Sequence, residues 1–140
     1  EGNVNVSKLA GVTVGPGGFI DIAQNARKVV FCGTFDTKGT EIKTGHGKLE
    51  LIKTGKICKF VETVDQITFS GKQALFQEQE VLYVTERAVF RLRKEGLELV
   101  EIAPGVEMGK DVIDQMKFKP LVPESIGTMN SKFFIDDEHA

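Results

Sequence analysis

A glycine-rich loop, Gly15-Pro16-Gly17-Gly18, has the residue types that suit the binding of an anion. Glycines lack a Cβ atom, so their backbone can take positive φ and a ligand can approach their N–H groups closely. A predicted helix follows, and the first N–H groups of a helix lack partners while its dipole favours negative charge. The loop therefore predicts a site for a phosphate, a carboxylate or a developing oxyanion.

The loop is not a complete nucleotide motif. It lacks the Lys-Ser/Thr pair of a phosphate-binding P-loop and the glycine spacing of a dinucleotide fingerprint. A tight turn that serves only close packing of a helix on a sheet stands as an equal alternative at this point.

The histidines and cysteines favour structural interpretations. His46 lies between two glycines in a predicted hairpin tip, and His139 lies in a predicted tail, so both are expected to be solvated. Cys32 falls in an apolar strand and is predicted to be a small core residue. Cys58 is predicted to be half-buried and structural. No nucleophile and base can be paired from these residues.

Several polar residues stand at predicted strand ends. Glu86 lies between two strands, where a structural salt bridge with Arg87 or Arg91 is favoured over catalysis. In open α/β sheets, ligands bind beyond the carboxyl ends of strands. Three residues near such ends are therefore candidates of second rank: Ser7, Thr34 and Asp36.

The composition excludes several classes of protein. The 140 residues suit one domain, with 41% hydrophobic and 27% charged residues. A net charge of −2 without a basic block argues against nucleic acid as a partner. No apolar run reaches the ~18 residues of a membrane helix, and the amino terminus is polar, so neither a membrane span nor a signal peptide is expected. Two cysteines without metal-ligand spacing predict no metal site and a cytoplasmic location.

The elements around the loop read as an α/β crossover. The spacing predicts a helix over residues 19–26 whose buried face holds Phe19, Ile22, Ala23 and Ala26. The apolar run Val29–Cys32 predicts a strand buried on both faces, within residues 28–33. Strand, glycine loop, helix and strand in this order predict a parallel pair.

The remaining elements follow from hydrophobic period and turn residues. Ser70 and Gln73 form a predicted capping box at the start of a helix that runs to about residue 79. A helix is also predicted over residues 110–117, and a frayed tail over residues 136–140. Strands are predicted over residues 1–8, 41–44, 48–53, 57–64, 66–69, 80–85, 86–93 and 97–102. The predicted fold class is α/β, an open mixed sheet with helices on its faces.

Six segments together resemble one enzyme family: GNVNVSKL, GPGGFIDIAQNARKVVFCGTF, KFVETVDQITFSG, EVLYVTERAVFRL, GLELVEIAPGVE and DVIDQMKFKP. They are similar to the carboxyl-terminal part of the acetate and short-chain acyl-CoA:3-ketoacid CoA-transferases, from Gly2 to about Pro120. The resemblance implies a cytoplasmic, homo-oligomeric enzyme of short-chain acyl-CoA, ketone-body and fatty-acid metabolism. It also implies coenzyme A as a substrate and no permanently bound cofactor.

The resemblance gives the glycine loop a role. In this family a glutamate attacks acyl-CoA, giving an acyl-glutamyl anhydride and then a glutamyl-CoA thioester, from which CoA passes to an acceptor carboxylate. By position, the backbone of Gly17 and Gly18 is expected to support the oxyanion. Val14, Gly15, Gly17 and Gly18 are expected to contact CoA.

The nucleophile itself is not expected within these residues. The family glutamate lies in a Glu-Ser/Asn-Gly motif upstream of the matching region, and no such motif occurs here. Residues 1–135 are therefore expected to be a carboxyl-terminal domain that is inactive alone, self-associates and needs the amino-terminal portion of the enzyme. The alternative is a non-catalytic module of the same fold that binds CoA, another anion or a partner.

Overall fold

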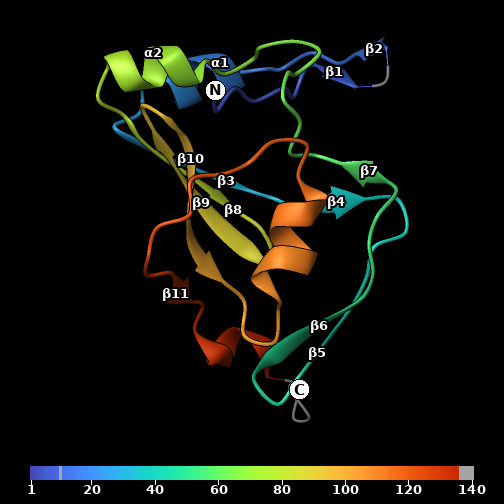
Figure 1. Cartoon of the computed structure of the whole chain (residues 1–140). Coiled ribbons are helices and arrows are strands. Elements are labelled where there is room, and N and C mark those ends of the chain that lie inside the picture. Colours follow the sequence, from blue (N-terminus) through green and yellow to red (C-terminus); the bar gives the residue numbers. More distant parts are fainter. Residues whose placement is uncertain (10, 136–140) are drawn as a thin grey trace.

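A five-stranded mixed sheet is the centre of the computed structural model, which describes residues 1–9 and 11–135 (Figure 1). The strand order is β11-β10-β9-β8-β3. The strands are β3 (Lys28–Cys32), β8 (Glu80–Val84), β9 (Ala88–Arg93), β10 (Gly96–Ile102) and β11 (Gly127–Thr128). The middle strands β8, β9 and β10 form an antiparallel meander, while β3 runs parallel to β8 and β11 parallel to β10. The predicted mixed α/β sheet is confirmed.

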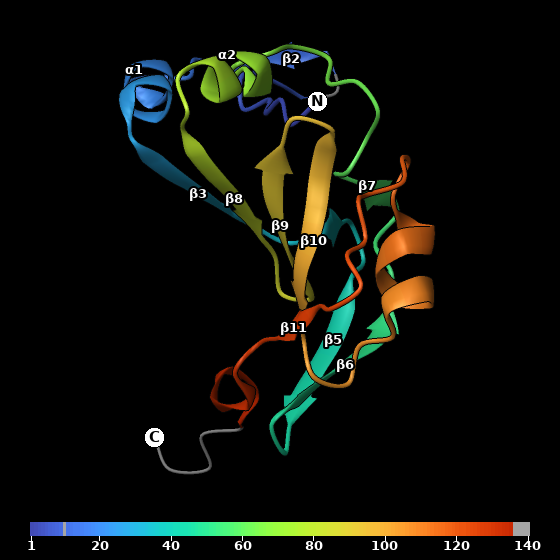
Figure 2. The ribbon, with the colours of Figure 1, turned by 60° about the vertical axis from the view of Figure 1, so that its left-hand side comes forward.

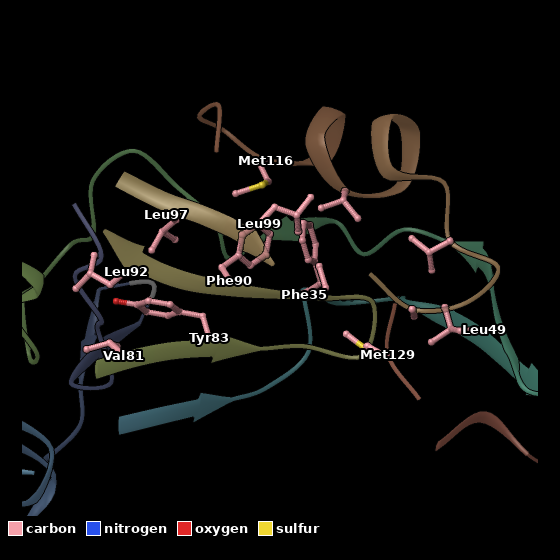
Figure 3. Packing of buried hydrophobic residues seen from close by; sticks show 14 of the residues in the cluster. Phe35, Leu49, Val81, Tyr83, Phe90, Leu92, Leu97, Leu99, Met116 and Met129 are labelled. Carbon is pink, nitrogen blue, oxygen red and sulfur yellow. The ribbon is translucent and has the colours of Figure 1, made fainter. Parts of the chain in front are cut away.

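Alternation along the strands separates a buried face from an open one. The buried face carries the core residues Val81, Tyr83, Phe90, Leu92, Leu97 and Leu99, whose packing Figure 3 shows. On the opposite face Val30 is 47% exposed and Cys32 is exposed. The predictions of a strand buried on both faces and of a core Cys32 are therefore wrong, because β3 is an edge strand with one face uncovered.

The helices deliver small or apolar side chains to the buried face. The α-helices are α1 (Phe19–Asn25) and α2 (Gly71–Phe76); a π-helix, η1 (Met108–Val112), continues into the 3₁₀ turn η2 (Ile113–Gln115), and a second 3₁₀ turn is η3 (Ser131–Phe134). Ala23, Ala74, Val112 and Phe134 are buried in one cluster with the sheet residues. The helix predicted over residues 110–117 thus exists as a π-helix and a 3₁₀ turn.

The face of α1 differs from the prediction. Phe19 packs on Phe31 of β3, with the ring centroids 6.0 Å apart, and Ala23 is buried one turn later. Ile22 was predicted to face the core but is 75% exposed. A helix turns about 100° per residue, so the short α1 can direct only one narrow stripe, Phe19 and Ala23, at the sheet.

Half of the predicted capping box of α2 is present, because the Ser70 hydroxyl accepts the Gln73 N–H at 3.2 Å. The reciprocal bond is not formed, since the Ser70 N–H donates to Gln24 Oε1 at 3.3 Å. The helix ends at Phe76, earlier than predicted, and Glu78 has φ of +55° in the connection to β8.

The predicted parallel pairing of β3 with a strand before the glycine loop is wrong. The parallel partner of β3 is β8, whereas β1 and β2, before the loop, pair with each other and Val4 bridges to Phe69.

Three two-stranded ribbons complete the fold. They are β1 (Lys8–Leu9) with β2 (Val12–Thr13), β4 (Asp36–Thr37) with β7 (Ile57–Cys58), and β5 (Glu41–Gly45) with β6 (Lys48–Lys53). The β1–β2 ribbon lies with α1 and α2 at one end of the sheet, and the β5–β6 hairpin projects at the other (Figures 1 and 2). The strands predicted over residues 1–8, 57–64 and 66–69 are much shorter. Val4 and Phe69 form only an isolated bridge.

The β5–β6 hairpin has a tighter turn than the three-residue loop predicted for it. Gly45 pairs with Lys48, so the turn consists of His46 and Gly47, with φ of +51° and +75°. Two positive φ values are the mark of a type I′ turn, whose twist matches that of the strands. His46 is exposed there, as predicted. His139 and the predicted tail, residues 136–140, lie outside the described residues.

Candidate functional site

The glycine loop connects β2 to α1 and is tied down at both ends. The Val14 N–H donates to the Ser7 carbonyl at 2.7 Å, and the Phe19 N–H donates to the Pro16 carbonyl at 3.2 Å. Gly17 has φ of +56°, which side chains with a Cβ rarely adopt. Gly18 has φ of −79° and is the N-cap of α1. The loop is therefore fixed at its ends and needs glycine at position 17.

The backbone donors of the loop face open space. The N–H groups of Gly15, Gly17 and Gly18 donate to no acceptor among the described residues. A Cβ atom built on Gly15 or Gly17 would meet nothing within 4 Å, and one on Gly18 would meet only Ile22 Cδ1, at 3.5 Å. An anion or a carbonyl oxygen can therefore approach these N–H groups without displacing protein atoms.

Exposed aliphatic side chains flank the loop on both sides in the sequence. Val14 and Ile20 are about half exposed, and Val12 and Ile22 more so. When a bound group displaces water from these side chains, the local dielectric falls. Hydrogen bonds from the loop to that group are then screened less and become stronger. The loop thus combines polar donors with an apolar border, a combination common in small-molecule sites.

Ser7, a candidate of second rank, supports the loop from beneath. Its side chain is buried and its hydroxyl lies 2.7 Å from the Thr68 hydroxyl, while its N–H donates to Asn5 Oδ1 at 3.1 Å. The Ser7 carbonyl receives the Val14 N–H. These partners occupy the polar atoms of Ser7, so its role is to position the loop.

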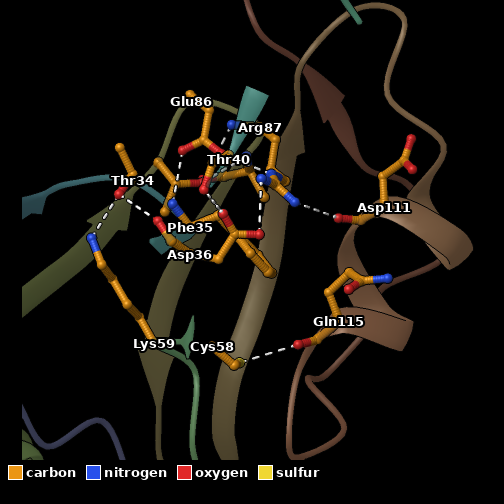
Figure 4. A network of polar contacts seen from close by, with 12 residues as sticks. Thr34, Phe35, Asp36, Thr40, Cys58, Lys59, Glu86, Arg87, Asp111 and Gln115 are labelled. Atoms are coloured by element: carbon orange, nitrogen blue, oxygen red, sulfur yellow. Dashed lines mark hydrogen bonds and ion pairs between the residues drawn. The ribbon is translucent and has the colours of Figure 1, made fainter. Parts of the chain in front are cut away.

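Three other candidates meet in a separate polar network at the carboxyl ends of β3 and β8 (Figure 4). Arg87 is its centre and is fully buried. Its Nε donates to Glu86 Oε1 at 2.7 Å, and a terminal nitrogen donates to Asp36 Oδ2 at 3.3 Å. The Phe35 N–H donates to Glu86 Oε2 at 2.8 Å, and the guanidinium lies 4.7 Å from the Phe35 ring centroid. The predicted structural salt bridge of Glu86 is confirmed.

The network also fixes neighbouring segments. Thr40 donates to the other oxygen of Asp36, and Arg87 donates to the Asp111 carbonyl of the π-helix at 3.3 Å. The Thr34 hydroxyl donates to the Asp36 carbonyl and accepts from Lys59 Nζ at 2.6 Å. These bonds join residues 34–40, 59, 86–87 and 111, so the network acts as a cross-link of the fold.

Cys58 lies beside this network and is half-buried, as predicted. Its thiol contacts the carbonyl oxygens of Phe60 and Gln115 at 3.3 and 3.1 Å. Both carbonyl oxygens can accept from the S–H group, so the side chain is held in place. Cys58 is therefore structural.

The predicted site residues thus divide between two places. Ser7 lies with Val14, Gly15, Gly17 and Gly18, whereas Thr34, Asp36 and Glu86 gather around Arg87. The sequence did not reveal the pairing of Asp36 with Arg87, since the two residues lie far apart in the chain and each also has other local partners. The signal that existed was a charged pair, Glu86-Arg87, directly before an apolar strand.

Two further properties bear on what the site can hold. Within residues 1–9 and 11–135, no group of three or more metal-ligating side chains comes together. No described helix has the length and apolar character needed to cross a lipid bilayer. The N–H groups of the glycine loop, which have no acceptor among the described residues, can donate hydrogen bonds to an anion or an oxyanion.

The chain matches no protein-family model. It is 44% identical over 136 residues to the acetate CoA-transferase YdiF of Escherichia coli K12, which covers 97% of this chain and 26% of the relative. It is 46% identical over 138 residues to the caffeate CoA-transferase of Acetobacterium woodii, covering 95% of this chain and 26% of that protein. The chain thus spans about a quarter of the length of these relatives.

Solved structures agree with these sequence relatives. The YdiF acyl-CoA transferase of Escherichia coli O157:H7, in its thioester complex with CoA, matches with a TM-score of 0.92 at 44% identity, over 96% of this chain and 26% of that one. The apoenzyme matches with a TM-score of 0.93 over the same shares. The homologues of this chain are CoA-transferases, and it has a CoA-transferase-like fold.

Proposed function

We propose that this chain is the carboxyl-terminal portion of a CoA-transferase that moves CoA between a short-chain acyl-CoA and a carboxylic acid such as acetate or acetoacetate. The observation that carries the proposal is the match to YdiF, 44% identical with a TM-score of 0.92 to a CoA thioester complex. Residues 1–135 would form one domain of that enzyme.

The proposed reaction is an exchange through covalent carboxylate intermediates. A glutamate carboxylate attacks the acyl carbon of acyl-CoA, which releases CoA thiolate and leaves an acyl-glutamyl anhydride. The thiolate then attacks the glutamyl carbonyl, which releases the first carboxylate and leaves a glutamyl-CoA thioester. An acceptor carboxylate reverses these steps and leaves with CoA. Each step exchanges one acyl bond for another, so a difficult transfer is divided into easier ones.

The glycine loop would stabilise the charge that develops on the carbonyl oxygen in these steps. The supporting observation is that the N–H groups of Gly17 and Gly18 make no hydrogen bond with any described residue and face open space. Preorganised donors of this kind are worth about 100-fold or more in turnover when one is removed. Val14 and Gly15 would contact the CoA chain beside them.

The nucleophilic glutamate would come from outside these 140 residues. Glu86, the carboxylate that the sequence singled out, already binds Arg87 and the Phe35 N–H. The glutamate motif of the resemblance does not occur in the sequence. We therefore expect the isolated chain to be inactive. We also propose a cytoplasmic, homo-oligomeric parent enzyme of short-chain acyl-CoA metabolism.

A chimera tests the function. In the chimera this chain would replace the matching segment of E. coli YdiF. The assay would supply acetate and a short-chain acyl-CoA other than acetyl-CoA, and would measure the acetyl-CoA that forms. We expect transfer by the chimera and none by the isolated chain. A folded chimera without transfer would refute the proposed function. If the isolated chain then still bound CoA, the non-catalytic binding module would be favoured.

A pair of substitutions in the chimera tests the loop. Gly18→Val adds a branched side chain beside the proposed oxyanion donors, at a φ that valine accepts. Gly33→Val is the control, because a Cβ there meets nothing within 4 Å and its φ is not positive. We expect Gly18→Val to lower turnover about 100-fold and Gly33→Val to change it little. Equal turnover in both variants would show that the oxyanion assignment is wrong.

A further inference from the structure

The uncovered side of the central sheet is apolar at its centre. We define the open sheet face as Val30, Cys32, Leu82, Val84, Arg91 and Val100. The strand neighbours of Val30, Leu82 and Arg91 point the other way, into the core, whereas Val100 and the exposed Glu101 follow each other at a β-bulge. Two ion pairs, Lys28 with Glu80 and Arg93 with Glu98, border this face. In Figure 2 the π-helix and the β5–β6 hairpin lie together to one side of the sheet. The strand β3 is also an edge, and its outer side has no partner strand among the described residues.

Arg91 is a cation on this face without a partner. In register it lies between Leu82 of β8 and Glu98 of β10. The Glu98 carboxylate pairs instead with Nε of Arg93. The Nε atom of Arg91 is buried and has no hydrogen-bond partner, and Arg91 forms no ion pair with any described residue. A buried donor left unsatisfied is costly, which favours an acceptor supplied by another segment.

We infer that the open sheet face is where the remaining portion of the transferase polypeptide docks, with apolar side chains on Val30, Leu82, Val84 and Val100 and a carboxylate on Arg91. The inference rests on the proposed function. Open α/β sheets are stable when both faces are covered, and helices with an apolar stripe are the usual cover.

The length of the relatives favours this occupant over a second copy of the chain. The chain aligns with only 26% of the relatives' length, so a large part of a homologous enzyme has no counterpart here.

Cys32 reports on the face directly. It is exposed on the open sheet face, whereas Cys58 is half-buried and held by two carbonyl contacts, so Cys58 is an internal control. Thiol alkylation would be followed peptide by peptide in the isolated chain and in the YdiF chimera. We expect the rate at Cys32 to fall at least tenfold in the chimera, while the rate at Cys58 stays low in both.

The carboxylate on Arg91 has its own matched pair of variants. Arg91→Met in the chimera should restore most of the Cys32 reactivity, because an acidic group would then face an apolar side chain. Arg93→Met, which removes an arginine that is 46% exposed and already paired, should leave Cys32 protected. Equal effects of the two variants would overturn the carboxylate contact.

Other outcomes would overturn the docking itself. Cys32 that reacts as fast in the folded chimera as in the isolated chain would refute it. Protection of Cys32 that rises with the concentration of the isolated chain would assign the face to a second copy instead. The readout needs no turnover. A chimera that protects Cys32 but transfers no CoA would therefore refute the proposed function alone.

Discussion

Removal of the Arg87 guanidinium is the sharpest test of the buried network. Arg87→Met keeps a long apolar side chain but leaves the carboxylates of Asp36 and Glu86 without their shared cation. The side chain of Asp36 is only 5% exposed and that of Glu86 15%, so water cannot replace the cation well. The loss also removes the hydrogen bond to the Asp111 carbonyl and the contact with the Phe35 ring.

The expected loss is about 3–5 kcal/mol in the free energy of unfolding, the usual cost of removing one partner of a buried ion pair. The free energy of unfolding of a domain of this size is about 5–15 kcal/mol in total. Over most of that range the variant should stay folded enough for its unfolding transition to be measured. Urea unfolding of the 140-residue chain, followed by circular dichroism, would give the difference. Arg93→Met is the control, because its pair with Glu98 is partly exposed and should be worth less than about 1 kcal/mol.

If Arg87→Met does not fold, Arg87→Lys keeps the positive charge but loses the planar fork that reaches both carboxylates. It should fall between wild type and Arg87→Met. A change below about 1 kcal/mol for Arg87→Met, or equal losses for the Arg87 and Arg93 variants, would show that the network does not hold the fold together.

Two further predictions concern single buried positions. Burial raises the pKa of Tyr83 above its ordinary value, so above about pH 10 the unfolded chain loses the phenol proton while the folded chain keeps it. The contribution of Tyr83 to the free energy of unfolding is fully present below pH 10 and should fall above it by up to about 1.4 kcal/mol per pH unit. Urea unfolding between about pH 9 and 11 would measure this slope, and Tyr83→Phe should remove the part that is due to Tyr83. Gly55→Ala would place a Cβ against the Thr37 carbonyl and 2.7 Å from Asp36 Oδ1, and should cost about 1–3 kcal/mol. Gly33→Ala has open space and should cost nothing, so equal melting temperatures for the two variants would contradict this reasoning.

Features set by a few adjacent residues could be predicted from the sequence. The Ser70 cap, the β5–β6 hairpin around His46 and the start of α1 at Phe19 depend on local turn chemistry and hydrogen bonds within a few residues. The glycine loop was also predicted as a candidate site on those grounds, because free N–H groups and positive φ are local properties.

Features set by distant pairing could not be predicted in this way. An apolar run such as Val29–Cys32 reads the same in a central strand and in an edge strand, and only the position beside β8 decides which side chains are exposed. The same holds for Ile22, whose exposure depends on how α1 sits on the sheet. Asp36 and Arg87 pair across 51 residues of sequence, and no local pattern records that contact.

The order of strands in the central sheet has a consequence for how the chain folds. The meander β8-β9-β10 is built from neighbours in sequence, whereas β3 joins β8 only after the loop of about 50 residues between them has closed. Loop closure must precede that contact, so we expect the meander to form early and β3 to dock late. As an edge strand β3 should also open before the central strand β9 in the native state. Native-state hydrogen exchange would then show the amides of β3 exchanging before those of β9, and the reverse order would refute this sequence of events.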